Sequence, residues 1–149
     1  MYAPHVVTLY NVTEDATTLE LTNNITVLDG VFLDIGKARN VEKTGLADAN
    51  AVTMFIPFSV TATDGLTGKK KTYIPPKEYR RLGDKSNHWT LEPGGESSGA
   101  DCFFVKGKVI STESYRSLRE QLDYVYDVST VDLRDFGSTD MQHWQVGGR

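Results

Sequence analysis

The stretch ITVLDGVFLDI, residues 25–35, decides the fold together with VTMFIPFSV, residues 52–60. Apolar side chains alternate with other residues along both stretches, and successive side chains of a β-strand point to opposite faces. Each stretch is therefore predicted to be a half-buried strand. Between them, residues 36–51 (GKARNVEKTGLADANA) form a polar insert far longer than the about two to five residues of a tight hairpin loop. A rigid sheet that carries a long polar loop is typical of binding and assembly surfaces.

The rest of the chain extends the same pattern with runs that are rich in β-branched and aromatic residues. Further strands are predicted at residues 5–12, 70–74, 89–91, 102–110, 125–133 and 141–146. Residues 13–24 are expected to form a loop in which 17–21 is at most a short edge strand, and residues 147–149 a loose tail. One clear helix is expected at residues 113–124, with Ser111 or Thr112 as its cap, and a short helix is expected from Pro76.

These elements predict a mainly β fold, because successive strands joined by short loops favour an antiparallel arrangement. The expected fold is a small antiparallel β-barrel or sandwich with one main α-helix and long loops. Three positions are expected to interrupt the strands. Gly30 is typical of a bulge, Pro57 lacks the ladder N–H, and the parity of the apolar residues changes near Ser129-Thr130.

The bulk properties fit one domain that spans residues 1–149, with a core that needs no disulfide or metal. The net charge of −4 argues against general binding to nucleic acids. The single cysteine, Cys102, is predicted to be a buried apolar thiol. No leader with a basic and then an apolar part is visible, and no apolar stretch reaches the length of a membrane span. Synthesis in the cytoplasm and no contact with a membrane are therefore expected.

No motif of catalysis or cofactor binding stands out, so an enzyme is not expected. The histidines His5, His88 and His143 lack the spacing of a metal motif, and neither a nucleophile elbow nor a phosphate-binding loop occurs. The carboxylates between residues 123 and 135 are best explained as solvated surface charges. We expect no metal and no cofactor.

Basic residues concentrate in one part of the chain. Such a group can contact DNA phosphates or an acidic protein surface, and lysines on a hairpin also guard against edge-to-edge aggregation. Trp144 can either pack in the core or anchor an interface. The candidate interface or DNA-facing residues are Lys69, Lys70, Lys71, Lys77, Arg80, Arg81 and Trp144.

Several blocks, taken in order, resemble one known group of proteins. They are HVVTLYN (5–11), VLDGV (27–31), VTMFIPF (52–58), YIPPKEY (73–79), WTL (89–91), FVKG (104–107), FGS (136–138) and HWQVGG (143–148). Together they resemble the minor capsid or head–tail connector proteins of tailed bacteriophages and of prophages of Gram-positive bacteria. The resemblance spans nearly the whole chain, and none of the blocks is a catalytic motif.

The resemblance implies a structural protein of the virion neck, made in the host cytoplasm. Similar proteins act as head-closure or stopper subunits, which form a ring between the portal and adaptor rings above and the tail protein below. Such a ring retains the packaged DNA that passes through its channel and docks the tail. Six copies are favoured and twelve are possible. Stopper subunits carry a long loop that reaches into the channel, and the matching candidates here are Lys37, Arg39, Glu42, Lys43 and Asp48.

Two other classes of function stay open. The chain could be a capsid decoration protein or another virion binding module, or an oligonucleotide-binding barrel, which would need exposed aromatic side chains and a basic groove. A small hydrolase would need a convergent polar pocket, which the sequence does not indicate.

Overall fold

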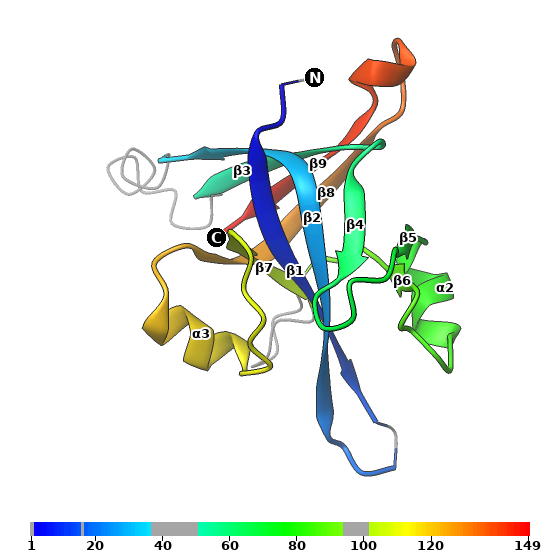
Figure 1. The fold of residues 1–149 in the computed structure, drawn as a ribbon, viewed down its shortest axis with the longest axis vertical. Helices are drawn as coiled ribbons and strands as arrows, with labels where there is room; N and C mark the ends of the chain where they lie inside the picture. Colours follow the sequence, from blue (N-terminus) through cyan, green and yellow to red (C-terminus); the bar gives the residue numbers. More distant parts are fainter. Residues whose placement is uncertain (1, 16, 37–50, 94–101) are drawn as a thin grey trace.

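Most regular structure in the computed structural model is β-strand (Figure 1), and the structure describes residues 2–15, 17–36, 51–93 and 102–149. Its strands are β1 (His5–Glu14), β2 (Leu21–Ile35), β3 (Val52–Pro57), β4 (Thr61–Asp64), β5 (Thr72–Tyr73), β6 (His88–Trp89), β7 (Cys102–Lys106), β8 (Val125–Arg134) and β9 (His143–Gly148). The helical elements of the described residues are α2 (Pro76–Arg81), α3 (Tyr115–Gln121) and the 3-10 turn η1 (Thr139–Met141).

Six strands close into an antiparallel barrel. Their order is β1-β7-β8-β9-β3-β2, and β2 pairs back with β1, which completes the circuit. β4 lies beside β2, whereas β5 and β6 form a separate parallel pair. The predicted mainly β fold is therefore confirmed, and the continuous pairing makes it a barrel rather than a sandwich.

β2 bends at Gly30, which allows one long strand to serve two parts of the barrel. His5 pairs with Val31 but Val6 pairs with Asp29, so Gly30 is the extra residue of a bulge. Its φ of +101° is a conformation that glycine adopts readily. On its other edge, β2 pairs with β4 before the bulge and with β3 after it. The predicted irregularity at Gly30 is confirmed.

The other two predicted interruptions are also present. β3 ends at Pro57, and three residues separate it from β4, which continues along the same edge of β2. Ser129 is skipped in the pairing of β8 with β9, because Val128 pairs with Gly148 and Thr130 with Gly147. Ser129 is therefore the extra residue of a bulge, whereas at Pro57 the strand ends.

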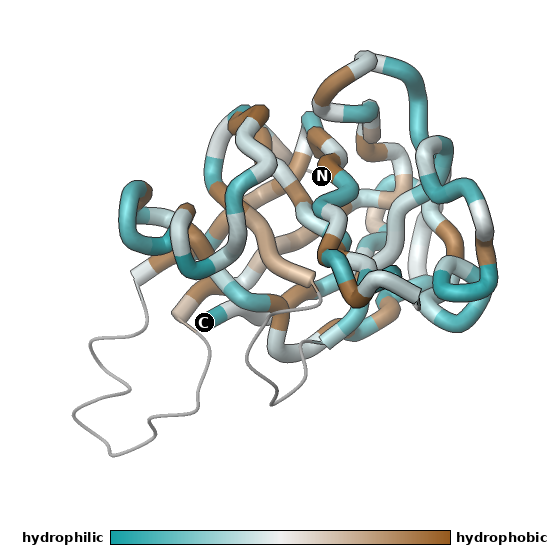
Figure 2. The backbone as a smooth tube through the Cα atoms, turned by 90° about the horizontal axis from the view of Figure 1, so that it is seen from below, coloured by the Kyte–Doolittle hydropathy of each residue, from teal (hydrophilic) through white to brown (hydrophobic). Residues whose placement is uncertain are grey.

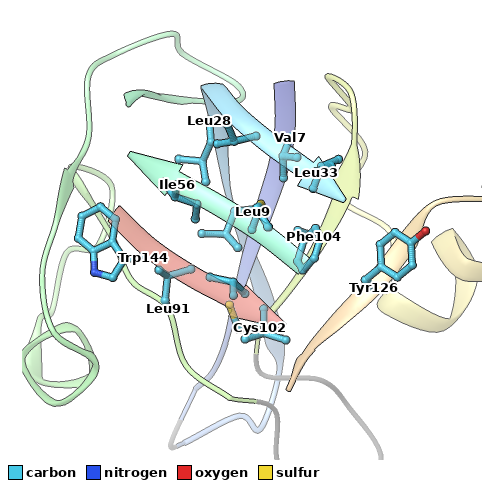
Figure 3. Close-up of a cluster of buried hydrophobic side chains, with 14 of the residues drawn as sticks. Val7, Leu9, Leu28, Leu33, Ile56, Leu91, Cys102, Phe104, Tyr126 and Trp144 are labelled. Carbon is cyan, nitrogen blue, oxygen red and sulfur yellow. The ribbon is translucent and has the colours of Figure 1, made fainter. Parts of the chain in front are cut away.

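The core fills the barrel with side chains from nearly every strand. Apolar segments run through the centre of the molecule, whereas the outer turns are mostly hydrophilic (Figure 2). Val7, Leu9, Leu28, Ile56 and Phe104 are fully buried in this cluster (Figure 3). Complete burial of one such side chain stabilises the fold by about 1.5–3 kcal/mol. A second cluster beside α3 contains Tyr10, Ile25, Phe103, Val105, Leu118 and Val125.

The expected loop at residues 13–24 is wrong. β1 continues to Glu14 and β2 begins at Leu21, and the two strands pair from Asn11–Asn24 out to Glu14–Leu21. The reason is that β-branched residues such as Val12, Thr13 and Thr22 favour an extended backbone. The result is a two-stranded ribbon that projects beyond the barrel (Figure 1).

The main helix is shorter than predicted, and its cap differs. α3 begins at Tyr115 because Ser114 is the N-cap, with its Oγ accepting a hydrogen bond from the Ser117 N–H. Glu113 was expected to be the first residue of the helix but precedes it. Its carbonyl accepts a hydrogen bond from Asn23 Nδ2 at 2.7 Å, which ties the residues before the helix to β2.

The expected loose tail at residues 147–149 is also wrong. Gly147 and Gly148 belong to β9 and pair with both β3 and β8. A Cβ atom on Gly148 would lie 2.8 Å from side-chain atoms of both Phe104 and Val52, so a larger residue has no room there. Gly147 and Gly148, which the sequence suggested to be a flexible tail, therefore belong to a strand, and Gly148 allows close packing.

Deletion of residues 37–50 is expected to leave a folded barrel. Ile35 pairs with Val52, so Gly36 and Ala51 would form a two-residue hairpin loop between them. Shortening the loop should stabilise the fold by about 1–2 kcal/mol through chain entropy, less any strain in the new turn. Circular dichroism and thermal unfolding measure this. A variant that loses its β-sheet signal would show instead that the insert is part of the fold.

Candidate functional site

The insert that carries the candidate channel residues lies outside the described part of the chain. Lys37, Arg39, Glu42, Lys43 and Asp48 all fall between Gly36 and Ala51. The strands on either side fix where the insert leaves and rejoins the barrel. Ile35 pairs with Val52, and Val52 in turn pairs with Gly148 of β9. Both junctions are therefore at the same end of the barrel.

Most of the candidate basic residues are exposed. Lys69 and Lys70 lie between β4 and β5, and Lys77, Arg80 and Arg81 lie on α2. α2 forms because Pro76 suits the first helical turn, while Arg80 and Arg81 suit the negative end of its dipole. Arg80 also forms an ion pair with Glu92. The exposed candidates are Lys69, Lys70, Lys77, Arg80 and Arg81.

Lys71 is an exception, and its expected role at an interface is wrong. Its side chain is only 1% exposed and its Nζ lies 3.4 Å from Asp64 Oδ2. Nζ also donates hydrogen bonds to the carbonyl of Ile25 and to Thr26 Oγ1, both at 3.1 Å. Lys71 therefore holds the β4–β5 connection against β2 and is not available to a partner.

Burial and mutual attraction act in opposite directions on the pKa values of Lys71 and Asp64. Burial lowers the pKa of Lys71, and the charge and hydrogen bond of Asp64 oppose this effect. For Asp64, burial acts to raise the pKa, but hydrogen bonds from the N–H groups of Thr67 and Leu66 and the charge of Lys71 outweigh it and keep the pKa below 3.8. Asp64 thus serves the ion pair and the turn at once.

Trp144 belongs to the core, so its assignment to an interface is also wrong. It is 8% exposed and its ring centroid lies 4.5 Å from those of Phe58 and Tyr73 and 5.5 Å from that of Trp89. These rings close one side of the barrel and attach the β5–β6 pair to it. The register explains the burial, because Trp144 lies opposite the buried Ile56.

A cavity of about 310 Å³ separates α2 from the outer end of β1. Beneath it, Asn11 donates a hydrogen bond to the carbonyl of Thr90 at 3.0 Å and to Cys102 Sγ at 3.5 Å. Cys102 is fully buried, as predicted. The hydroxyl of Tyr79 is buried and has no hydrogen-bond partner in the described structure, and burial raises the pKa of Tyr79 above its ordinary value.

An aromatic row on the outer face of the barrel was not expected from the sequence. Its neighbouring ring centroids are 5.5 to 6.2 Å apart, and it crosses from the N-terminal segment over β2 and β3 to β9. The row consists of Tyr2, His5, Phe32, Phe55 and His143. The alternation of β2 and β3 already placed Phe32 and Phe55 on the outer face, but only the register aligns them.

The described residues contain no group of three or more histidines, cysteines or carboxylates that could hold a metal ion. His5 and His143 lie at separate positions along the aromatic row, and His143 Nδ1 is 2.8 Å from the carbonyl oxygen of Met141. Among the described helices, none has the length and apolar character needed to cross a membrane.

Comparison with known proteins gives a family but no function. Residues 3–149 match the model of a family described as a family of unknown function, DUF6751. The chain belongs to this family. No curated protein and no solved structure matches it.

Proposed function

We propose that the protein is a non-enzymatic structural component of a bacteriophage virion, acting as a head-closure subunit in the neck. Copies form a ring, six favoured and twelve possible, between the portal or adaptor above and the tail protein below. The ring retains packaged DNA and docks the tail. The proposal rests on the resemblance of the ordered sequence blocks together with the architecture described above.

The observation that carries the proposal is a closed barrel with projecting hairpins. Closure removes nearly all free strand edges, so the barrel itself is a rigid, inert body. The β1–β2 ribbon and the β8–β9 hairpin project from it at opposite ends (Figure 1). Leu19 and Leu21 on the first and Phe136 and Met141 on the second are more than half exposed. Apolar side chains on projecting hairpins suit contacts with neighbouring subunits.

Electron microscopy of particles with a tagged copy tests the proposal. The expected result is density for the tag at the head–tail junction, in a ring whose symmetry gives the copy number. Tag density spread over the capsid lattice would instead indicate a decoration protein, and its absence from particles would overturn the proposal.

The 37–50 deletion tests the part of the proposal that concerns the channel. If the barrel folds but particles leak DNA or fail to join tails, the insert acts in retention or docking. If the deletion variant gives particles of normal yield and DNA content, residues such as Lys37 and Arg39 have no role in the channel. The description of the barrel would be unchanged by that result.

An oligonucleotide-binding barrel is the second candidate, because the aromatic row offers faces on which bases could stack. The charges on the same face oppose it. Asp132 pairs with Gln145, which pairs with Phe55, so this carboxylate shares the outer face with the row. Salt-dependent binding of single-stranded DNA, lost in Phe55→Ala, would favour this candidate over the neck protein.

A further inference from the structure

The β1–β2 ribbon forms an arm to which no third strand pairs in the described structure, and at its base Asn23 Nδ2 donates hydrogen bonds to the carbonyls of Thr112 and Glu113. We define the arm as residues 12–15 and 17–24. β7 pairs with β1 only as far as Asn11, and β4 pairs with β2 only from Thr26 onward. Beyond these positions the two strands have each other as their only strand partners in the described structure. A two-stranded ribbon is marginally stable by itself, so an arm of this kind gains most from a partner.

The tip of the arm is held in one conformation by its own hydrogen bonds. The Asp15 N–H donates to the carbonyl of Glu20 at 2.9 Å and the Leu19 N–H donates to the carbonyl of Asp15 at 2.8 Å. Asp15 Oδ1 accepts hydrogen bonds from the N–H groups of Thr17 and Thr18. A preorganised tip loses little conformational entropy when it binds.

The tip presents a leucine where the backbone disfavours one. Leu19 has a φ of +61° and is 67% exposed. Glycine or asparagine would be easier to accommodate at such a position in a solvent-exposed turn. Leu21, on the next outward position, is 65% exposed. The arm also carries three acidic residues and no basic residue, namely Glu14, Asp15 and Glu20.

The complementary surface lies on the same chain. Residues 66–85, which we call the basic module, contain seven basic and two acidic residues, a net charge of +5. The whole chain has a net charge of −4, so the remainder carries −9. Lys71 and Arg80 have internal partners, but Lys69, Lys70, Lys77 and Arg81 are exposed. Leu66 adds an exposed apolar side chain, at 64%.

We propose that the arm of one copy docks on the basic module of the next copy. The two surfaces have opposite charge, and each adds exposed leucine. Contacts between two different patches of identical subunits run head to tail and close into a ring when the rotation permits. The inference rests on the proposed ring and names its contact. It also assigns the exposed basic residues to a protein partner rather than to DNA phosphates.

Charge reversal in the full-length chain tests the contact. Glu14→Lys with Glu20→Lys changes the net charge of the arm from −3 to +1, and Lys77→Glu with Arg81→Glu lowers that of the module from +5 to +1. Asp15 is left intact because it holds the turn. Each pair should weaken self-association about tenfold or more in sedimentation velocity, since two attractions become repulsions. Added salt should weaken the wild-type association. An equimolar mixture of the two variants should recover it in large part, because half of the contacts in an alternating ring join an unchanged arm to an unchanged module, and in the other half the introduced lysines face the introduced glutamates.

A control reverses two exposed charges elsewhere and leaves the net charge of the chain unchanged. Arg116→Glu with Asp123→Lys lies on and just after α3, outside both surfaces, and should associate like the wild type. Leu19→Asn keeps a residue that tolerates the turn but removes the apolar contact, and it should weaken association without lowering thermal stability. If both reversal variants associate like the wild type, or if their mixture fails to recover association, the inference is wrong.

Particles separate the inference from the proposed function. If the free chain is monomeric, the test uses particles that lack the wild-type protein. Each variant, and the mixture of the two, is then assayed for incorporation into these particles. Neck rings that form normally with either reversal variant alone would overturn the contact while the neck assignment stands. A protein absent from particles that still shows salt-dependent, mixture-restored association would overturn the neck assignment alone. No association in solution and no incorporation would overturn both.

Discussion

Trp144→Ala is expected to destabilise the fold by about 3–5 kcal/mol, the range for truncating a large buried aromatic residue. The indole packs against Phe58, Tyr73 and Trp89, so its removal opens a cavity where the β5–β6 pair meets the barrel. Denaturant unfolding followed by circular dichroism measures the loss as a lower midpoint.

Two further variants serve as comparisons for Trp144→Ala. Trp144→Phe keeps a ring against Tyr73 and should lose less stability, whereas Phe136→Ala removes a side chain that is 68% exposed and should change it little. If Trp144→Ala unfolds at the wild-type midpoint but fails to join particles, the residue is an interface anchor and the packing interpretation is wrong.

Asp64→Asn is expected to cost about 3–5 kcal/mol, because it leaves the buried ammonium of Lys71 without its counter-charge. The asparagine oxygen can still accept the hydrogen bonds of Leu66 and Thr67, so the substitution isolates the charge from the turn. Adding Lys71→Met should recover much of the loss, since it removes the unpaired charge and keeps the volume. A double variant no more stable than Asp64→Asn would contradict this account.

The same pair predicts how stability depends on pH. Asp64 has a lowered pKa in the folded state, so its contribution is present above 3.8 and is lost as the pH falls through the folded value. The difference in unfolding free energy between the wild type and Asp64→Asn should therefore shrink in acid. In Asp64→Asn, the lowered pKa of Lys71 means that the penalty of its charge is relieved as the pH rises through the folded value.

The sequence predicted the mainly β fold, with barrel and sandwich left open, because strand patterns are local. Alternation placed β2 and β3 correctly. Gly30 marked one bulge, and the change in the parity of the apolar residues marked the other near Ser129. The ends of strands were predicted less well. Polar threonines and asparagines at residues 13–24 resemble a loop by composition, but their backbone pairs in a ribbon whose side chains can face water on both sides. Hydrophobic pattern gives no signal for such a ribbon.

The candidate site was harder to predict because it depends on long-range contacts. Lys71 follows two exposed lysines in the sequence, and only the folded chain brings Asp64 and β2 around it. Trp144 likewise needed its register partner to show which face it occupies. The aromatic row joins residues more than a hundred positions apart, and no local pattern encodes that distance.

The position of β9 has a consequence for synthesis of the protein on the ribosome. β9 is the shared partner of β3 and β8, and the residues that form it are numbered 143–148. Until these residues leave the exit tunnel, a nascent chain displays both neighbours as unpaired edges, open to strand pairing with other nascent chains. Slowing translation just before His143 should therefore increase aggregation of the nascent chain.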